Sequence, residues 1–340
     1  MRFFQNANYP FLQWRKRAYL VTAALMVVGI GSMIVHSLKG DRWLNYGVDF
    51  TGGTVVQVSF THPVSEEHVR AATTAAGQHW EITRFGNAND FLVRTQSFGQ
   101  EAGADAQSRV TQAMSTRFKP VVQGQPGGDF RIVRTEAVGP KAGSELERKA
   151  LVAILLSFVA ILGYLALRFE WRFALAAVIA TVHDILVTLG FLAVTRTEIS
   201  LGTVAAVLTV LGYSMHDTII VFDRVREDLG KPRHGRSFVD ILNKAINETL
   251  PRTLLTVATV MATLLALLVF GGPVIFGFTL VLVLGIAIGT FSSIFVASPV
   301  LYEIERHFPR QEKKEQAVRS RSSGGRRPTQ ARPAAEVRTR

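Results

Sequence analysis

Five long stretches of this sequence contain either no charged residue or a single aspartate, and they decide what kind of fold the chain can adopt. They cover residues 18–35, 150–167, 173–195, 199–222 and 253–302. A helix needs about 20 apolar residues to cross a bilayer, and the last stretch is long enough for two such helices. Gly271-Gly272-Pro273 is the natural break within it, because glycine and proline end helices and favour turns. The sequence therefore predicts a membrane bundle of six transmembrane helices.

The composition supports this fold class. Of the 340 residues, 48% are hydrophobic and 19% are charged, whereas soluble domains carry about 25% charged residues. The chain has no cysteine, which excludes disulfides, thiol nucleophiles and thiolate metal sites. The first apolar stretch is too long for the core of a signal peptide and lacks a clear cleavage site, so we expect it to be an uncleaved anchor.

The basic residues of the short loops predict the orientation of the helices. They lie at 15–17, at Arg168 and Arg172, and at seven positions between 224 and 252. Lysine and arginine mark cytoplasmic loops, while long segments cross the membrane regardless of charge. Both termini are therefore expected in the cytoplasm, and the long segment 39–149 outside it.

These features give an expected organisation for the whole chain. Its parts are a cytoplasmic N-terminus (1–17), a first transmembrane helix (18–38), an exported domain with linkers (39–149), helices two to six (150–306) with a basic cytoplasmic loop (223–252), and a basic disordered tail (307–340). The formal charge of +12 lies mostly in the tail and short loops, which indicates contact with anionic lipids rather than a specific nucleic acid.

The basic loop has an apolar pattern of its own. Its apolar residues recur at helical spacing and are Phe238, Ile241, Leu242, Ala245 and Ile246. Such a pattern beside basic residues is typical of an amphipathic helix that lies on the membrane surface. We therefore expect this helix to rest on the inner leaflet.

The exported segment alternates between strand and helix patterns. Strands are predicted at 53–60, 80–85, 91–95 and 130–138, and helices at 64–76 and 104–118. The order β-α-β-β-α-β is that of the ferredoxin-like split motif. The expected fold class is thus an α-helical membrane bundle with one α+β ferredoxin-like periplasmic domain inserted between helices 1 and 2. Its histidines, at 62, 68 and 79, share no metal-ligand spacing, so no metal site is expected here.

Two aspartates interrupt the apolar stretches, and ionisable groups at bilayer depth are candidates for function. They are Asp184, preceded by His183, and Asp217, preceded by His216; Arg224 follows seven residues after Asp217. Three interpretations remain open. The carboxylates carry protons; or the polar groups, with Thr181, Thr188, Thr209 and Ser214, only hold helices together; or the His and Asp side chains of both helices form a hydrolytic metal centre, although no established motif supports one. The stretch 285–289, with glycine at each end, predicts a close helix-packing face.

Several short motifs resemble those of the SecF family, and they occur in the family's order. They are Asp49-Phe50-Thr51-Gly52-Gly53, Val138-Gly139-Pro140, Arg168-Phe169-Glu170-Trp171-Arg172, His183-Asp184, Gly212-Tyr213-Ser214 through Asp217 to Asp223-Arg224-Val225-Arg226-Glu227, and Phe270-Gly271-Gly272-Pro273. Each lies at the topological position that the hydropathy demands. The resemblance therefore covers most of the chain outside its tail.

This resemblance implies a protein-export subunit of the bacterial inner membrane. It implies a partner, SecD, and a place beside the SecYEG channel, where the proton motive force helps to complete the translocation of preproteins. It also implies a relationship to proton-driven RND exporters. No cofactor and no classical enzyme active site are expected. Two alternatives are a stand-alone RND-like proton-coupled exporter and an intramembrane metallohydrolase.

The resemblance also suggests roles for particular residues. Asp184, Asp217 and Arg224 become candidates for a proton relay, joined by His183 and His216. Many family members have asparagine where this chain has His216, so this histidine either joins the relay or replaces an amide hydrogen bond. Asp223, Arg226 and Glu227 form the motif at the end of the fourth helix. The segment 49–53 serves either as a glycine hinge for the exported domain or as a plain loop that enters a strand.

Overall fold

The computed structural model describes residues 8–67, 69, 80–84, 89–95, 130–138, 140–231 and 237–309. Within them, six helices are long and apolar enough to cross a membrane. The helices are α1 (Arg15–Leu38), α5 (Pro140–Arg168), α6 (Trp171–Thr195), α7 (Leu201–Leu229), α8 (Phe238–Phe270) and α9 (Pro273–Ser292), which continues through the π-helical segment η2 (Ser293–Ala297) into α10 (Ser298–His307). The predicted count of six membrane helices is confirmed, and Gly272, with a φ of +73°, lies in the predicted break.

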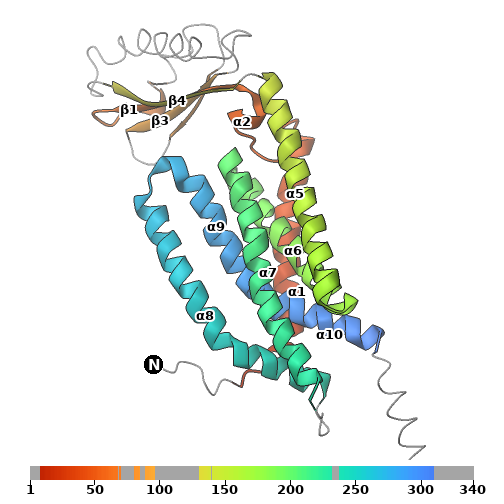
Figure 1. Cartoon of the computed structure of the whole chain (residues 1–340). Helices are drawn as coiled ribbons and strands as arrows, with labels where there is room; N and C mark the ends of the chain where they lie inside the picture. Colours follow the sequence, from red (N-terminus) through yellow and green to blue (C-terminus); the bar gives the residue numbers. More distant parts are fainter. Residues whose placement is uncertain are drawn as a thin grey trace, which may run out of the picture.

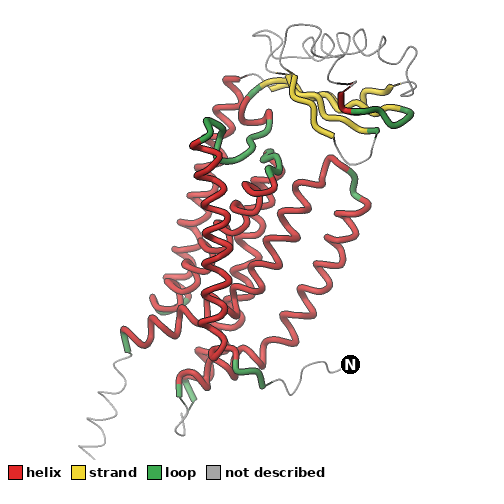
Figure 2. Tube along the Cα trace, turned by 180° about the vertical axis from the view of Figure 1, so that it is seen from behind, coloured by secondary structure: helices red, strands yellow, loops and turns green. Residues whose placement is uncertain are grey.

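The helices run side by side and carry a β-sheet at one end, here called the sheet end (Figures 1 and 2). Three helices, α6, α7 and α9, form the centre of the bundle and are buried over half or more of their membrane windows. In contrast, the membrane windows of α1, α5 and α8 are only 17%, 6% and 11% buried. Both predicted aspartates belong to the central helices.

Among the described residues, the sheet contains four antiparallel strands in the order β2-β3-β1-β4. The strands are β1 (Gly53–Phe60), β2 (Trp80–Arg84), β3 (Asp90–Thr95) and β4 (Phe130–Val138), so all four predicted strands are confirmed. Val56 pairs with Val93 of β3 and Thr135 of β4. One face carries the core of Val56, Val58, Phe60, Ile82, Phe91 and Val93. The predicted helix 104–118 and the tail from 310 lie outside the described residues, as does all but the beginning of the helix 64–76.

The predicted helix at residues 238–246 is present, but its predicted position on the membrane surface is wrong. Residues 238–250 begin the long helix α8, and Ile241, Leu242, Ala245 and Ile246 are buried against the bundle rather than laid on lipid. They belong to a core cluster that also holds Phe11 and Leu12. Sequence periodicity identifies an apolar face but not its neighbour, and here the neighbour is protein.

Polar contacts fix the beginning of α8 against the N-terminal segment. Asn247 accepts a 2.9 Å hydrogen bond from the Tyr9 backbone N–H and donates one to its carbonyl, while Asn243 accepts from Leu12 N–H at 3.0 Å. Figure 1 shows α8 bending near its beginning, at the end opposite the sheet. Pro251 lies inside the helix there, and proline removes a helical hydrogen bond and bends its helix.

Candidate functional site

Asp184 is the most enclosed charged residue among those that the structure describes, with 0% of its surface exposed. It lies near the middle of α6, roughly 17–20 Å from either end of that helix. Its Oδ2 accepts hydrogen bonds from Ser214 of α7 and from Ser292 of α9, the latter at 2.7 Å. Its Oδ1 lies 2.9 Å from Nδ1 of His183. One carboxylate therefore joins the three central helices.

Small residues make this meeting of α7 and α9 possible. A Cβ atom added at Gly289 would lie 2.9 Å from the Ser214 Cβ, too close for any real side chain, and one added at Gly285 would overlap Val210. The predicted packing face at 285–289 is thus confirmed. Because the helices approach so closely, two short serine side chains can reach the same carboxylate.

The π-helical segment η2 begins directly after Ser292. Ser298 donates a 3.0 Å hydrogen bond to the Ser293 carbonyl across this segment. Single π-helical turns inside helices occur frequently at functional sites. A wider turn therefore follows immediately on the residue that holds Asp184.

Asp217 lies one turn beyond Ser214 on α7, and its side chain is only 1% exposed. Thr290 of α9 donates a 3.3 Å hydrogen bond to its Oδ2. Nδ1 of His216 lies 3.5 Å from its Oδ1, and Oδ1 has no hydrogen-bond partner among the described residues. Asp217 therefore has fewer hydrogen-bond partners than Asp184.

No hydrogen bond joins these two carboxylates, but α9 donates a hydrogen bond to each of them. Ser214 and Asp217 lie on one face of α7, and Thr290 and Ser292 lie two residues apart on α9. Nε2 of His183 is buried and has no hydrogen-bond partner among the described residues, while the His216 side chain is 53% exposed. Adjacent helical residues point about 100° apart, yet each histidine still reaches the carboxylate that follows it.

The side chains of this arrangement have the chemistry that proton exchange requires. A charged carboxylate at bilayer depth is costly, so such groups tend to exchange protons or pair with one another. Hydroxyl groups can donate or accept, which lets Ser214 and Ser292 serve Asp184 in either protonation state. Within the described part of the chain, no group of three His, Asp or Glu side chains could hold a metal ion.

The three threonines that were considered as interhelical contacts bond mainly to their own helices. Thr188 and Thr209 donate to carbonyls of their own helices, at 2.7 and 2.8 Å. Thr181 does so as well, and its hydroxyl also lies 2.9 Å from Sδ of Met215 on α7. Ser214, the fourth residue considered there, differs because its hydroxyl donates to the carboxyl group of Asp184 on another helix.

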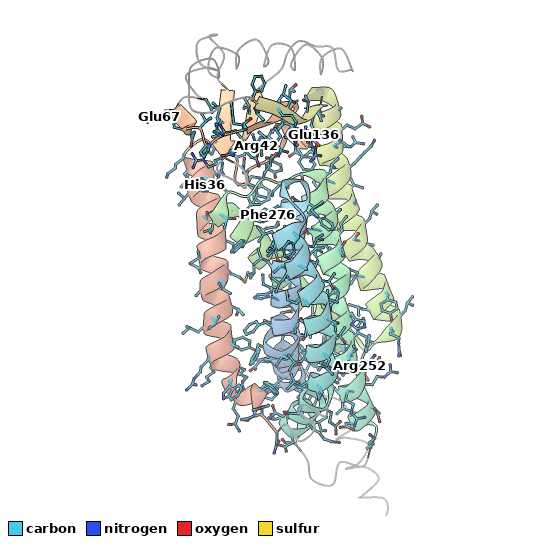
Figure 3. The ribbon with its side chains drawn as sticks, turned by 90° about the vertical axis from the view of Figure 1, so that its left-hand side faces the viewer. His36, Arg42, Glu67, Glu136, Arg252 and Phe276 are labelled. Atoms are coloured by element: carbon cyan, nitrogen blue, oxygen red, sulfur yellow. The ribbon has the colours of Figure 1, made fainter. Side chains whose placement is uncertain are left out.

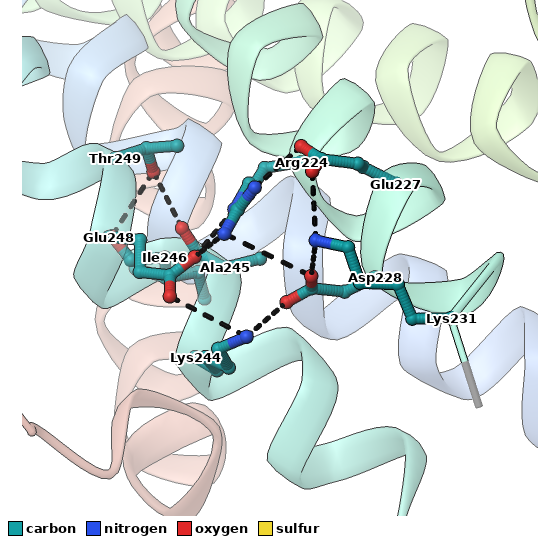
Figure 4. A network of polar contacts seen from close by, with 9 residues as sticks. All are labelled: Arg224, Glu227, Asp228, Lys231, Lys244, Ala245, Ile246, Glu248 and Thr249. Carbon is teal, nitrogen blue, oxygen red and sulfur yellow. Dashed lines mark hydrogen bonds and ion pairs between the residues drawn. The ribbon is translucent and has the colours of Figure 1, made fainter. Parts of the chain in front are cut away.

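Arg224 belongs to an ionic network in the last turns of α7 (Figure 4). Figure 1 shows this end of α7 on the side of the bundle opposite the sheet. Its guanidinium contacts Glu227 and Glu248 closely and lies 3.9 Å from Asp228. Asp228 in turn accepts 2.9 Å hydrogen bonds from Lys231 and Lys244. The structure therefore assigns Arg224 to the junction of α7 and α8 rather than to the buried carboxylates.

The other residues of the helix-end motif fasten α7 to its neighbours. Asp223 lies 3.6 Å from the guanidinium of Arg168, and Arg226 donates a 3.2 Å hydrogen bond to the Arg168 carbonyl. Glu227 pairs with Arg224 and Lys231. Asp223 and Arg226 thus join the end of α7 to the turn between α5 and α6.

The segment 49–53 combines an anchor with a glycine turn. Val48–Thr51 form the short helix α2, and Asp49 Oδ2 accepts a 2.8 Å hydrogen bond from the Leu201 N–H at the start of α7. Phe50 is buried. Gly52 and Gly53 follow with φ of +71° and +123°, conformations that side chains rarely adopt. The first half is thus fixed to the bundle, and the glycine pair makes the turn into β1.

Sequence reasoning missed the residues of α9 that complete the site. Thr290 and Ser292 stand in a long apolar stretch with no ionisable group near them in sequence. Hydroxyl residues are common in membrane helices and often bond to their own backbone, so only the packing of α9 on α6 and α7 reveals these two.

Comparisons with known proteins agree with this architecture. The family model described as "Protein export membrane protein SecD/SecF, C-terminal" matches residues 118–307, and the SecD/SecF GG motif matches residues 40–64. The protein translocase subunit SecF of Gemmatimonas aurantiaca is 45% identical over 91% of each chain. That of Desulfurispirillum indicum is 40% identical over 91% of this chain and 98% of its own.

A solved structure extends the similarity to the fold. The crystal structure of SecDF from Thermus thermophilus, described as a translocon-associated membrane protein, matches with a TM-score of 0.76 and 30% identity. The match covers 90% of this chain but only 40% of that chain. With its six apolar helices this chain is a multi-pass membrane protein, and it belongs to the SecF family of protein translocase subunits.

Proposed function

We propose that this chain acts with SecD to use the proton motive force for promoting and completing preprotein translocation through the SecYEG channel. The relatives are named as subunits of a transport assembly and not as enzymes. SecD is supported as the partner because the similar SecDF structure is a much longer chain, of which this one spans 40%. The proton gradient supplies the energy, and no cofactor takes part.

The proposed topology follows the loop charges. The sheet end, with residues 39–149 arranged as a ferredoxin-like domain, faces the periplasm, and both termini face the cytoplasm across the bacterial inner membrane. Arg168, Lys231 and Lys244 lie at the opposite end of the bundle from the sheet, as the positive-inside rule requires. The basic loops and the tail 307–340 contact anionic lipids, and no nucleic acid is involved.

The observation that carries this proposal is the contact of Asp184 with Ser214 and Ser292. A proton that binds or leaves this carboxylate changes the hydrogen bonds between α6, α7 and α9 together. Asp217, bonded to Thr290 and with one oxygen atom unpartnered, is the second proton-exchanging group. The start of α7 is hydrogen-bonded to Asp49, so movement of α7 reaches the segment that enters the sheet.

A pulse-labelled export assay tests the proposal in cells depleted of their own SecF. The chain would be expressed with its matched SecD as wild type, Asp184→Asn or Asp217→Asn, at equal membrane levels. Asparagine keeps the shape of the side chain, but its amide group does not take up or release a proton near neutral pH. The control is Glu145→Gln, which removes an exposed carboxylate of α5 that pairs with Lys149 and lies outside every candidate site.

We expect the wild type and the control to restore maturation of an exported protein, and at least one buried-site variant to fail while still assembling with SecD. If both buried-site variants restore export fully, the carboxylates serve packing alone and the proton role is wrong. If the wild type fails even with its matched SecD, the export role itself is wrong.

A further inference from the structure

A crevice of about 440 Å³ separates the sheet from the sheet end of the bundle. One wall is the face of the sheet that looks toward the bundle. The other is built from the α6–α7 loop, the start of α7 and the start of α9. Figure 3 shows Glu136 on the sheet and Phe276 below it at the head of α9. The crevice shares Asp49 with the anchored segment 49–53, but none of the residues that contact Asp184 or Asp217 line it.

The charged groups around the crevice are mainly acidic. Among the described residues that line it are three carboxylates, from Asp49, Glu136 and Glu198, and one guanidinium, from Arg134. Arg134 is paired with Glu136, and Asp49 accepts the Leu201 N–H. Since carboxylates outnumber cations here, the crevice favours a ligand that carries a positive charge.

Gln57 gives the second and independent sign of a ligand. It lies on the central strand β1, is only 5% exposed, and lines the crevice. No hydrogen bond to its side-chain amide occurs among the residues that the structure describes. Its side-chain nitrogen and oxygen stay accessible from the crevice and can pair with a ligand there. An amide offers both a donor and an acceptor, which is the pairing that a backbone peptide group provides.

Apolar side chains make up much of the remaining wall, beside the hydroxyl residues Thr197 and Ser200. Val55 and Leu92 lie on the sheet side, and Leu201 and Phe276 on the bundle side. Phe276 is 43% exposed although it is a large aromatic residue. A crevice of this volume, with apolar walls and a few convergent polar groups, has the character of a binding site.

We propose that this crevice binds an extended polypeptide segment that carries a cationic side chain. The amide of Gln57 pairs with a peptide group, the cation sits among Glu136, Glu198 and Asp49, and apolar side chains of the segment rest on Phe276 and Leu92. The inference rests on the proposed function only for the source of the segment, which is then the preprotein that leaves the channel.

The test uses the full chain in nanodiscs of neutral phosphatidylcholine. The probe is a short fluorescent peptide of alternating valine and lysine, and its binding is measured by fluorescence anisotropy. The variants are Gln57→Leu, which removes the amide at nearly constant size, and Glu136→Gln, which removes one charge. The control is Glu145→Gln, an exposed carboxylate outside the crevice that pairs with Lys149. All variants must elute as one species of wild-type size.

We expect Gln57→Leu and Glu136→Gln each to weaken binding about tenfold, the loss expected for one charge-assisted or buried hydrogen bond, and Glu145→Gln to leave it unchanged. A peptide with glutamate in place of lysine should bind much more weakly. Equal binding by the wild type and both crevice variants overturns the proposal.

A second measurement locates the peptide directly and does not depend on affinity. p-Benzoylphenylalanine is placed at Phe276, or at Phe308 as an exposed phenylalanine of the opposite end. Cross-linking at position 276 and not at 308 supports the proposal. If instead only phospholipid is cross-linked at 276, the crevice is a lipid site and the proposal is wrong. If the peptide does not bind while the export assay gives its expected result, the export role stands and this inference alone falls.

Discussion

The hydroxyl of Ser292 in α9 donates a 2.7 Å hydrogen bond to Asp184 in α6, a residue 108 positions earlier in the chain. Ser214 of α7 donates to the same oxygen atom. This carboxylate is therefore the point where α6, α7 and α9 are joined by polar contacts in the middle of the bundle.

Ser292→Ala is expected to weaken the contact of α9 with α6. A hydrogen bond to a charged group contributes about 1.5–3 kcal/mol, and one to a neutral carboxyl about 1 kcal/mol, so we expect a loss within this range. Denaturant unfolding in mixed micelles measures it. The control is Ser293→Ala, whose equally buried hydroxyl bonds to Thr290 of its own helix. Equal losses for both variants would show that the contact with Asp184 has no special weight.

Gly29→Ala is expected to separate α1 from α6. A Cβ at Gly29 would lie 2.7 Å from the Cα of Gly190, and the obstruction is backbone that cannot move aside. Overpacking of this kind costs about 1–3 kcal/mol. Gly31→Ala, two residues along, meets nothing within 4 Å and should be neutral or slightly stabilising because alanine favours helix. Thermal unfolding midpoints in detergent compare the two, and a stable Gly29→Ala protein would contradict the close approach.

Asp49→Ala is expected to loosen the start of α7. Its carboxylate accepts the Leu201 N–H at 2.8 Å, one of the backbone donors that a helix leaves unpaired at its first turn. Loss of such a cap costs about 1 kcal/mol. Hydrogen exchange at the amides of residues 201–204 should accelerate in Asp49→Ala but not in Asp49→Asn, which keeps an acceptor. Faster exchange in both variants would mean that the charge, and not the hydrogen bond, holds the helix start.

Asp228→Ala is expected to destabilise the junction of α7 and α8. The side chain is 5% exposed and accepts from Lys231 and Lys244, so its removal leaves two amines without their shared partner. We expect a loss of about 1–3 kcal/mol. Asp223→Ala, which removes a half-exposed ion pair with Arg168, should cost less than about 1 kcal/mol. The two unfolding free energies, measured at the same salt concentration, decide the order, and the reverse order would contradict the network.

Lys231 gives this junction a dependence on pH. Hydrogen bonds to Glu227 and then to Asp228 raise the pKa of Lys231 above its ordinary value of 10.5. A raised pKa means that the contribution to stability is complete below the unfolded-state value and disappears as the pH rises through the folded-state value. The difference in stability between wild type and Lys231→Met should therefore persist near neutral pH and shrink in strongly alkaline solution. A difference that does not change with pH would show that the amine contributes through packing alone.

The sequence by itself determined the membrane helices, the strands and the location of the two acids. Long apolar runs can satisfy their backbone in a bilayer only as helices, and alternating β-branched residues favour strands, so 53–60 and 130–138 were predictable with their bounds. The glycines at 285 and 289 likewise predicted a packing face, because their spacing alone places them on one side of a helix.

Only the tertiary structure decided which side chains meet. Ser292 and Thr290 reach Asp184 and Asp217 because α9 packs closely on α7, and spacing within one helix carries no information about a neighbour. Arg224 lies seven residues from Asp217 on the same helix, yet its long side chain pairs with Glu227 and Glu248 at the bundle end, where a charge is less costly than at bilayer depth. The sequence predicted an apolar face at residues 238–246. Whether lipid or protein covers that face depends on the position of the N-terminal segment, which only the tertiary structure shows.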